Sequence, residues 1–365
     1  MVRLSIPSVF PTNVFSKQLL IHNHYHHSVS RVFFSSSSPS SASAITSIPS
    51  PSSIIPLRSV LYIPGTKAEK GKSAKVRPDG IIFDLEDAIA PESKSLARET
   101  ILKTLLTDQS PSSSTSFGWR HLVVRINSPD TNPTWYKEDL KMVTELAKHQ
   151  KIQGIVIPKV NSSSVLQDTR TILTSSGISS QSLPLWAMIE TPLGILNIQK
   201  IAEQANQVNL TCLVAGTSDL TKDLRAQHVP LRTPVLTSLS MIILAARAYN
   251  LTALDGVHLT LDDEEGLRDV CSKGKELGFD GKTLIHPSQI EEANVAFGPT
   301  PEDIDNARLI MDAWTKSGGE KSTQGVLVIN GRLIENLHIA EAKMTLQYAE
   351  ILQQRQDSLE SDKKT

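Results

Sequence analysis

The stretch LRSVLYIPGTKAEKGKSAKVRPDGIIFDLEDAIAPESKSLAR, residues 57–98, decides the expected fold because it contains two short apolar strands that each end in polar residues. The first predicted strand, residues 59–63, ends at a Pro-Gly pair that is followed by several lysines. The second, residues 80–84, ends at Asp84 and leads directly to Glu86 and Asp87. Polar groups that follow parallel strands are where α/β folds place their active sites. The stretch therefore predicts an α/β fold with a site at the carboxyl ends of its strands.

The same alternation of short apolar runs and helical segments continues along the chain. Six further strands are predicted, at residues 121–126, 154–159, 183–190, 211–216, 253–259 and 282–287. Helical segments are predicted between the strands, among them residues 163–175 and 194–205. Strands that alternate with helices indicate parallel βα units, and nearly all-apolar strands suit a sheet that is covered on both faces. Eight units over about 230 residues match the size of a (β/α)8 TIM barrel. A doubly wound open sheet is the alternative, but it normally carries a Gly-rich turn after its first strand, and no G-x-G-x-x-G occurs.

The C-terminal part of the chain is predicted to form a small appendix to the barrel. A Gly/Ser/Lys/Thr-rich stretch reads as a linker. Beyond it, a strand at residues 325–329, the turn dipeptide Asn330-Gly331 and a helix at residues 337–354 form a hairpin-helix unit. The predicted divisions are a transit peptide at residues 1–56, the barrel at residues 57–314, the linker at residues 315–324 and the appendix at residues 325–365.

Composition excludes several classes of protein. Hydrophobic residues make up 39% of the chain and charged residues 21%, which is typical of globular proteins. The formal net charge of −1 provides no basic surface for nucleic acid or anionic lipid. The sequence has no apolar stretch long enough to span a bilayer. The two cysteines, Cys212 and Cys271, form no disulfide framework or zinc cluster, which fits a reducing compartment.

The N-terminal segment differs from the rest because it contains no Asp or Glu before Glu69. It carries Arg3, Lys17 and Arg31 and a dense run of serines from Ser35. This composition is typical of an organelle transit peptide, and a disordered tail without a targeting function is the alternative. The Arg-Val-Phe-Phe-Ser sequence that begins at Arg31 resembles a mitochondrial processing site, so we expect a mitochondrial location, with the chloroplast as the alternative.

The lysine-rich loop after the first strand nearly matches a phosphate-binding P-loop. Residues 65–73 read G-T-K-A-E-K-G-K-S, which departs by one residue from G-x-x-x-x-G-K-S. An extra residue spoils the cradle of backbone N–H groups that binds the phosphates, so the match does not support ATP hydrolysis. The lysines can still bind phosphate as point charges, or they can form a plain solvated helix face.

Four carboxylates follow three of the predicted strands, and they suggest a metal site. Glu86 and Asp87 follow one strand, Glu190 another and Asp219 a third. At one rim of a barrel they would repel one another and take up protons. A hard divalent cation resolves that conflict, and Mg²⁺ commonly takes one or two carboxylates together with waters and substrate oxygens. The alternative is that each carboxylate is a helix N-cap or an ion-pair partner.

Arg125, at the end of VVRIN, is predicted to lie on the same rim. An arginine near a metal suits binding of a substrate carboxylate or stabilisation of a developing oxyanion. A structural ion pair with the acidic cluster is its alternative role. His286 in LIHPSQ is as consistent with a structural role as with a catalytic base, and Cys212 is expected in the core.

These motifs together resemble the HpcH/HpaI aldolase and citrate lyase β-subunit family, in its citramalyl-CoA lyase, malyl-CoA lyase and citrate lyase β-like branch. The resemblance covers roughly residues 57–300. The motifs that carry it, in chain order, are RSVLYIPG, IIFDLEDAIAPESK, VRIN, GIVIPK, IETPLGI, LVAGTSDLTKDL, LDGVHLTLDDEEGL and GFDGKTLIHPSQI.

The resemblance implies a (β/α)8 barrel with Mg²⁺ held by Glu190 and Asp219, and it makes Arg125 the residue that binds the substrate or its enolate. Glu86 and Asp87 would reach waters bound to the metal. The residues implied as contacts to coenzyme A are Tyr62, Lys70, Lys72, Ile285 and His286. The lysine loop is one residue shorter than in the mitochondrial relatives, which weakens the transfer of the two lysines.

One position departs from the family pattern. The similar lyases use an acid/base aspartate just before the C-terminal helix, often across a trimer interface, and the comparable residue in GRLIENLHIAEAK is Glu335. Glutamate keeps the carboxylate but adds a methylene, and a shift of about 1 Å can cost about 10²-fold in rate. The extra methylene therefore leaves a retuned or weak activity open. The resemblance implies a homotrimer in which Glu335 takes part in catalysis.

The expected function is a Mg²⁺-dependent carbon–carbon lyase that cleaves a 3-hydroxy-3-carboxy acyl-CoA, such as citramalyl-CoA or malyl-CoA, to acetyl-CoA and a 2-oxo acid, or catalyses the reverse condensation. A non-catalytic CoA-binding protein is one alternative, which the change to Glu335 leaves open. An aldolase acting on free hydroxy acids is another. One methyl group in a pocket is worth only about 1–3 kcal/mol, so the sequence does not select the acyl group.

Overall fold

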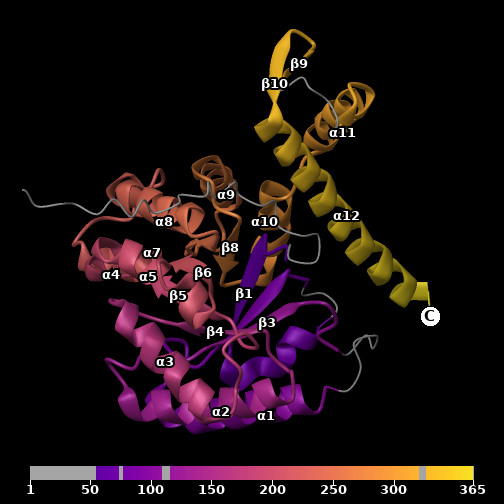
Figure 1. Cartoon of the computed structure of the whole chain (residues 1–365). Helices are drawn as coiled ribbons and strands as arrows, with labels where there is room; N and C mark the ends of the chain where they lie inside the picture. The colour runs from indigo at the N-terminus through magenta and orange to yellow at the C-terminus, as the bar shows by residue number, and fades with distance from the viewer. Residues whose placement is uncertain (1–54, 74–76, 109–115, 320–325, 365) are drawn as a thin grey trace, which may run out of the picture. The chain divides into compact units, whose positions relative to one another are not determined.

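Eight parallel strands close into a barrel in the computed structural model of this protein (Figure 1). The structure describes residues 55–73, 77–108, 116–319 and 326–364, so most of the predicted transit peptide lies outside the described residues. The barrel strands are β1 Ser59–Pro64, β2 Gly80–Asp84, β3 His121–Arg125, β4 Gly154–Ile157, β5 Leu185–Ile189, β6 Leu210–Ala215, β7 Thr252–Asp255 and β8 Gly281–Leu284. Each strand pairs with its neighbours in the chain, and β1 pairs with β8. The predicted TIM barrel is confirmed.

Helices follow the strands and surround the barrel (Figure 1). The α-helices are α1 Lys94–Leu106, α2 Pro133–Lys148, α3 Ser163–Ser175, α4 Pro192–Leu196, α5 Ile198–Ala202, α6 Ala205–Val208, α7 Thr217–Asp223, α8 Leu236–Ala248, α9 Glu264–Leu277, α10 Ile290–Phe297, α11 Pro301–Lys316 and α12 Asn336–Lys364. The 3-10 helices are η2 Gly65–Lys72, η3 Pro91–Ser93, η4 Thr233–Val235 and η5 Pro287–Gln289. α9 shows how the sequence sets such bounds: Asp263 accepts a hydrogen bond from the Gly266 N–H at its start, and Gly278 ends it with φ +103°.

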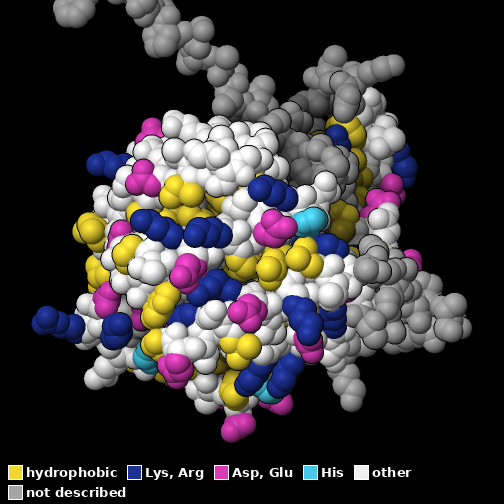
Figure 2. Space-filling view, turned by 90° about the horizontal axis from the view of Figure 1, so that it is seen from below, with side chains coloured by type: hydrophobic (Ala, Val, Ile, Leu, Met, Phe, Trp, Pro, Cys, Tyr) yellow, Lys and Arg dark blue, Asp and Glu magenta, His cyan; other side chains and the backbone are white. Residues whose placement is uncertain are grey.

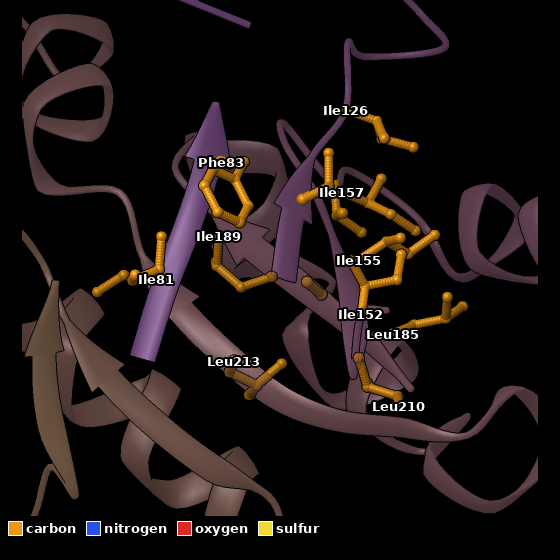
Figure 3. Close-up of a cluster of buried hydrophobic side chains, with 14 of the residues drawn as sticks. Ile81, Phe83, Ile126, Ile152, Ile155, Ile157, Leu185, Ile189, Leu210 and Leu213 are labelled. Carbon is orange, nitrogen blue, oxygen red and sulfur yellow. The ribbon is translucent and has the colours of Figure 1, made fainter. Parts of the chain in front are cut away.

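Two layers of apolar side chains hold the barrel together, because successive residues of a strand point to opposite faces. The inner layer fills the barrel and includes Val60, Ile82, Trp186 and Cys212, so the expected core position of Cys212 is confirmed. The outer layer packs between strands and helices, and Figure 3 shows part of it around Phe83. Complete burial of one such aliphatic side chain stabilises the fold by about 1.5–3 kcal/mol.

The C-terminal residues form the predicted hairpin and helix. β9 Val326–Ile329 and β10 Arg332–Glu335 pair antiparallel, and Asn330 and Gly331 between them both have positive φ, 49° and 77°. Positive φ at both central residues is the geometry of a two-residue type I′ turn. The predicted linker begins at residue 315, but α11 continues to Lys316, and residues 320–325 lie outside the described part. α11 and the appendix share a small apolar cluster around Ile310 and Ile339.

Helix α12 contacts the amino-terminal ends of the strands. Arg355 lies 3.4 Å from Oδ1 of the buried Asp79, which directly precedes β2, and its guanidinium stacks over the ring of Trp119 at 4.5 Å. Arg58 binds the same carboxylate at 2.8 Å. Within this chain the appendix therefore contacts the end of the barrel opposite to the carboxyl ends of the strands.

Candidate active site

The four predicted carboxylates, which we call the acidic rim, lie together at the carboxyl ends of the strands. Glu86 and Asp87 belong to the turn after β2, Glu190 directly follows β5, and Asp219 lies in the first turn of α7 after β6. Glu86 and Glu190 are buried, whereas Asp219 is partly exposed and Asp87 is exposed. The prediction that separate strand ends bring these side chains to one rim is confirmed.

Lys159, just after β4, links the four carboxylates of the acidic rim to one another. Its ammonium donates a hydrogen bond to Glu86 Oε1 and lies 3.5 Å from Asp87 Oδ1 and 3.9 Å from Asp219 Oδ2. Its backbone N–H donates to Glu190 Oε1 at 2.7 Å. Burial opposes the charge, but its bond to Glu86 and the surrounding carboxylates raise the pKa of Lys159 above its ordinary value.

The turn that carries Glu86 is fixed by the residues around it. Oδ1 of Asp84 accepts a hydrogen bond from the Glu86 N–H at 2.9 Å, and Oδ2 accepts one from the Ala88 N–H at 3.1 Å. The buried ammonium of Lys94 donates to the carbonyl oxygens of Leu85 and Glu86, both at 2.7 Å. These bonds satisfy backbone groups in a turn that has no strand or helix partner, so the carboxylate of Glu86 is held at the rim.

Arg125, the last residue of β3, is buried beside the acidic rim. Its Nε donates to Oδ1 of Asp84 and its Nη2 to Oδ2, both at 2.7 Å, and Nη1 lies 2.9 Å from Glu86 Oε2. The ring of Tyr62 lies 5.0 Å from the guanidinium carbon. Burial opposes the charge, but the carboxylate of Asp84 raises the pKa of Arg125 well above its ordinary value. The structure therefore fixes a permanent cation at the rim, in contact with the carboxylates as the structural alternative supposed.

Glu190 is the least compensated carboxylate of the rim. Burial, and then the charge of Glu86, raise its pKa to about 8, while Arg125 and Lys159 act in the opposite direction. The backbone beside it must be glycine, because a Cβ on Gly216 would lie 2.3 Å from Cβ of Glu190 and 2.6 Å from Oε2. Gly216 in the AGTSD motif, which follows β6, thus leaves room for the side chain of Glu190, which follows β5.

The residues implied as coenzyme A contacts lie in three places. Tyr62 faces Arg125 from β1, and its hydroxyl is buried without a hydrogen-bond partner. Ile285 and His286 follow β8 and are exposed at the same end of the barrel as the acidic rim. Lys70 is exposed on η2, whereas Lys72 pairs with Asp108 at 3.6 Å, which directs it away from the rim. The structure brings Tyr62 to the acidic cluster but not the two lysines.

Glu335 ends β10 and is exposed, and its backbone N–H donates to His338 Nδ1 at 3.0 Å. Among the described residues, no contact joins Glu335 to the acidic rim of its own chain. The neighbouring Ile334 and His338 border a cavity at the starts of β1 and β7, which is the other end of the barrel. Glu335 is therefore not part of an active site built from this chain alone.

Comparison with known proteins places the chain in a family. Residues 58–287 match the family described as HpcH/HpaI aldolase/citrate lyase. The chain belongs to this family. A (3S)-malyl-CoA thioesterase of Cereibacter sphaeroides (strain KD131) is 42% identical over 298 residues, which cover 81% of this chain and 96% of that protein. Citrate lyase subunit beta of Leuconostoc mesenteroides subsp. cremoris is 31% identical over 297 residues, which cover 80% of this chain and 93% of that protein.

Solved structures agree with the family assignment. The crystal structure of protein CitE from Mycobacterium tuberculosis in complex with magnesium and pyruvate has a TM-score of 0.54 and 27% sequence identity, and it covers 67% of this chain and 93% of that chain. The predicted branch of the HpcH/HpaI family is therefore confirmed, and a similar protein binds Mg²⁺ together with a 2-oxo acid.

The donor set of the acidic rim fits the Mg²⁺ that the family implies. Glu190 and Asp219 offer carboxylate oxygens, which are hard ligands. The four carboxylates of the rim outnumber the three cations of the described chain that contact them, which are Arg125, Lys159 and Lys222. Burial, and then the charge of Glu86, raise the pKa of Glu190, and a bound cation would oppose both effects. Among the residues that the structure describes, no group of three or more His, Cys, Asp or Glu side chains is arranged to hold a metal. Two carboxylates, with waters and substrate oxygens completing the shell, is an arrangement that Mg²⁺ tolerates.

Sequence reasoning missed two residues of the site and the partners of a third. The sequence places Asp84 in the polar group at the end of the second strand, but it does not show that Asp84 binds Arg125 and the turn of Glu86. Lys159 was read as part of the GIVIPK strand, and Gly216 as part of a motif. A signal was available for Lys159, since a lysine that follows an apolar strand and Pro158 lies at the same rim as the carboxylates. No local signal showed that Gly216 must lack a side chain.

A cavity of about 880 Å³ lies at the opposite end of the barrel and shares no residue with the acidic rim. It is lined by the starts of β1 and β7, by α11 and by the appendix. Catalytic groups of TIM barrels lie at the carboxyl ends of the strands, so we do not assign this cavity to catalysis.

On the face shown in Figure 2, Lys and Arg side chains are interspersed with Asp and Glu, and no field of one sign dominates. None of the helices that the structure describes is both long and apolar enough to cross a membrane.

Proposed function

We propose that this protein is a Mg²⁺-dependent carbon–carbon lyase that cleaves a 3-hydroxy-3-carboxy acyl-CoA, such as citramalyl-CoA or malyl-CoA, to acetyl-CoA and a 2-oxo acid, or runs the reverse condensation. The observation that carries the proposal is the buried cation Arg125 at the same rim as Glu190 and Asp219. Carboxylate ligands suit a metal that binds the hydroxy-acid end of the substrate. A fixed cation beside them suits the negative charge that develops as the carbon–carbon bond breaks.

The residues of the chain take separate roles in this mechanism. Bound Mg²⁺ would supply Lewis-acid polarisation of substrate oxygens, with Glu190 and Asp219 as its protein ligands. Glu86 and Asp87 would bind waters beside the metal. A base would take the proton of the substrate hydroxyl, and cleavage between C2 and C3 of the acyl group then gives the 2-oxo acid and the enolate of acetyl-CoA. Arg125 offsets the charge of this enolate, and its bidentate pairing with Asp84 fixes its orientation before the substrate arrives.

Coenzyme A would bind along the side of the rim formed by β1 and β8. These strands are neighbours, so Tyr62, Ile285 and His286 lie at adjacent strand ends. The unpartnered hydroxyl of Tyr62 suits the thioester end of the ligand, because a buried donor without a partner favours a bound acceptor. Lys70 and Lys72 remain proposed contacts for the phosphates.

Glu335 would return a proton to the enolate carbon from a neighbouring subunit. The contacts within one chain support this arrangement. The appendix contacts the amino-terminal end of its own barrel, through Arg355 and Asp79, and not its own acidic rim. We therefore propose a homotrimer in which each appendix serves the rim of another subunit. Mixed oligomers of Glu335→Gln and Arg125→Ala subunits should regain activity, because one interface then holds an intact site. Absence of rescue in verified mixed oligomers contradicts the arrangement.

Hydrolysis of the thioester is the second candidate, and the 42% identical (3S)-malyl-CoA thioesterase favours it. The two reactions break different bonds. A lyase releases a 2-oxo acid and keeps the thiol of coenzyme A blocked as acetyl-CoA. A thioesterase releases free thiol and the intact hydroxy acid.

The products separate these candidates in one experiment. Purified protein without residues 1–55 is incubated with Mg²⁺ and either citramalyl-CoA or malyl-CoA, and the 2-oxo acid and the free thiol are measured in parallel. We expect pyruvate or glyoxylate to appear together with acetyl-CoA and without free thiol. Free thiol without a 2-oxo acid would establish the thioesterase instead. Binding without either product indicates a non-catalytic CoA-binding protein, and cleavage of free citramalate indicates an aldolase acting on free acids.

We also propose a mitochondrial location, with the chloroplast as the alternative, on the basis of the acid-free, serine-rich first 56 residues. A fusion of these residues to a fluorescent reporter should accumulate in mitochondria. A cytosolic reporter contradicts the proposal.

A further inference from the structure

Lys159 is bound to all four carboxylates of the acidic rim, and no other cation among the described residues has this set of contacts. The ammonium reaches Glu86, Asp87 and Asp219, and the backbone N–H binds Glu190. Its side chain is only 23% exposed, so solvent screens these interactions weakly. Removing Lys159 would therefore change the charge and the geometry of the rim at once.

The backbone of Lys159 is held in the left-handed region, with φ +52°. This conformation is unfavourable for a residue with a side chain and persists where the surroundings determine it. Here it turns the N–H toward Oε1 of Glu190, at 2.7 Å. Glu190 would otherwise be a buried carboxylate without a backbone donor at this oxygen, so the strained residue fixes where one proposed metal ligand points.

The ammonium of Lys159 also opposes the binding of a divalent cation. It lies 3.9 Å from Asp219 Oδ2, a proposed metal ligand, in a partly buried environment where charges interact more strongly than in water. Lys222 contacts the same carboxylate from the other side, with Nζ 3.3 Å from Oδ1, but its side chain is 71% exposed. The two lysines therefore form a matched pair for an experiment. They have the same charge and contact the same carboxylate, but they differ in exposure to solvent.

We propose that Lys159 is a positioning residue that fixes Glu190 through its backbone and limits the metal affinity of the rim through its ammonium. This inference rests on the proposed function, because it takes Glu190 and Asp219 as the metal ligands. The ammonium keeps the carboxylate cluster compact, and it keeps metal binding weak enough for exchange with substrate oxygens. It acts on the metal ligands and is not itself required to touch the substrate.

The test measures the binding of Mn²⁺, as a paramagnetic substitute for Mg²⁺. Binding is followed by electron paramagnetic resonance, as the loss of the signal of free Mn²⁺. Lys159→Met, Lys159→Arg and Lys222→Met are compared with the unaltered protein at low and high salt. None of these substituents is branched at Cβ, so the left-handed position at residue 159 carries the same backbone cost. We expect Lys159→Met to bind Mn²⁺ at least about tenfold more tightly at low salt, because a nearby like charge is gone. Lys159→Arg and Lys222→Met should stay within about twofold, because the first keeps the charge and the second removes a screened one.

A second neutral variant separates the charge from folding. Lys159→Gly removes the ammonium, and glycine tolerates the left-handed backbone. This variant should therefore fold even if Lys159→Met fails to fold, and it should also bind Mn²⁺ more tightly than the unaltered protein. Metal-free thermal unfolding should show a lower Tm for Lys159→Met and a larger rise of Tm on adding metal. Equal or weaker Mn²⁺ binding by the neutral variants, or an equal gain in Lys222→Met, overturns the inference.

The outcome is distinguishable from failure of the proposed function. A protein that cleaves no acyl-CoA, but whose neutral variants bind Mn²⁺ more tightly, contradicts the lyase and leaves the role of Lys159 intact. An active lyase whose neutral variants bind Mn²⁺ no more tightly contradicts the role of Lys159 alone. A protein that binds no Mn²⁺ contradicts both.

Discussion

The two ends of the barrel both bury charge, but they treat it differently. At the amino-terminal end, Asp79 is completely buried and accepts hydrogen bonds from the backbone and guanidinium of Arg58 and from Arg355. At the carboxyl end, carboxylates outnumber the cations, and burial together with Glu86 raises the pKa of Glu190 to about 8. Removing one partner of a completely paired buried charge destabilises the fold, whereas incomplete pairing marks a candidate site for cation binding.

The comparison teaches how to separate structural from functional charges in one molecule. A buried charge with a complete set of partners is costly to alter, because removing one partner leaves the other unpaired. A buried charge with too few partners costs stability, and for the acidic rim we propose that it is retained for metal and substrate binding. Substitutions at the two ends should therefore change stability and activity in opposite ways.

Glu190→Gln should have the largest effect on function and a small effect on the fold. The amide is a poor ligand for a hard cation, so we expect Mg²⁺-dependent turnover to fall at least about 10³-fold. Because the change removes a buried, poorly compensated carboxylate, Tm in the absence of metal should stay equal or rise. Activity assays and thermal unfolding with and without Mg²⁺ check both parts, and near-native turnover at ordinary Mg²⁺ contradicts the assignment.

Asp79→Ala should have the reverse signature. It leaves the guanidinium of Arg58 half-buried without its partner, so we expect a loss of about 3–5 kcal/mol in the free energy of unfolding. The molecules that remain folded should keep native turnover. Glu276→Ala is the control, because it breaks an exposed pair with Lys273, and exposed pairs contribute little to stability. Comparable losses from the two substitutions in urea unfolding would remove the contrast between the ends.

Gly216→Ala should weaken the metal site without touching a ligand. Its Cβ would lie 2.3 Å from Cβ of Glu190, so the carboxylate or the backbone must shift. We expect Mn²⁺ affinity to fall about 10–100-fold, as for other changes beside metal ligands. Gly177→Ala is the control, since it meets no atom within 4 Å and has only the cost of its positive φ, +88°. Unchanged metal affinity in Gly216→Ala would show that the rim can rearrange freely.

His121 gives the smallest effect, and it concerns pH at the amino-terminal end. Its ring stacks on Trp186 with centroids 5.5 Å apart, and burial, followed by the charge of Arg355, lowers its pKa to about 4. A histidine with a lowered folded-state pKa stabilises the fold above its unfolded value of about 6.5, and that contribution is lost as the pH falls from there toward 4.

Lowering the pH from 7.5 to 5.5 should therefore cost about 1 kcal/mol through His121. His121→Phe keeps an aromatic ring over Trp186 and should lose that part of the pH dependence, as measured by urea unfolding at the two pH values. The same slope in both proteins would show that His121 is not the group responsible.

Local sequence patterns predicted much of this molecule. Strand β2 and helix α3 have the predicted bounds, Gly80–Asp84 and Ser163–Ser175, because apolar periodicity reports a face that must be buried. The predicted helix at residues 194–205 is instead three short helices. Asn197 lies between the first two, and its side chain donates to the carbonyl of Asn161. A side chain that bonds to distant backbone in this way has no signature in local periodicity.

The sequence by itself determined the eight βα units, the family, and the rim where Glu86, Glu190 and Asp219 meet, because strand order and side-chain alternation follow from residues close together in the chain. The tertiary structure alone decided which charges are compensated. Arg355 and Asp79 are 276 residues apart, and Lys159 and Glu86 come from different βα units. Electrostatic pairing depends on distance and burial in space, so only the closed barrel distinguishes the paired end from the incompletely paired one.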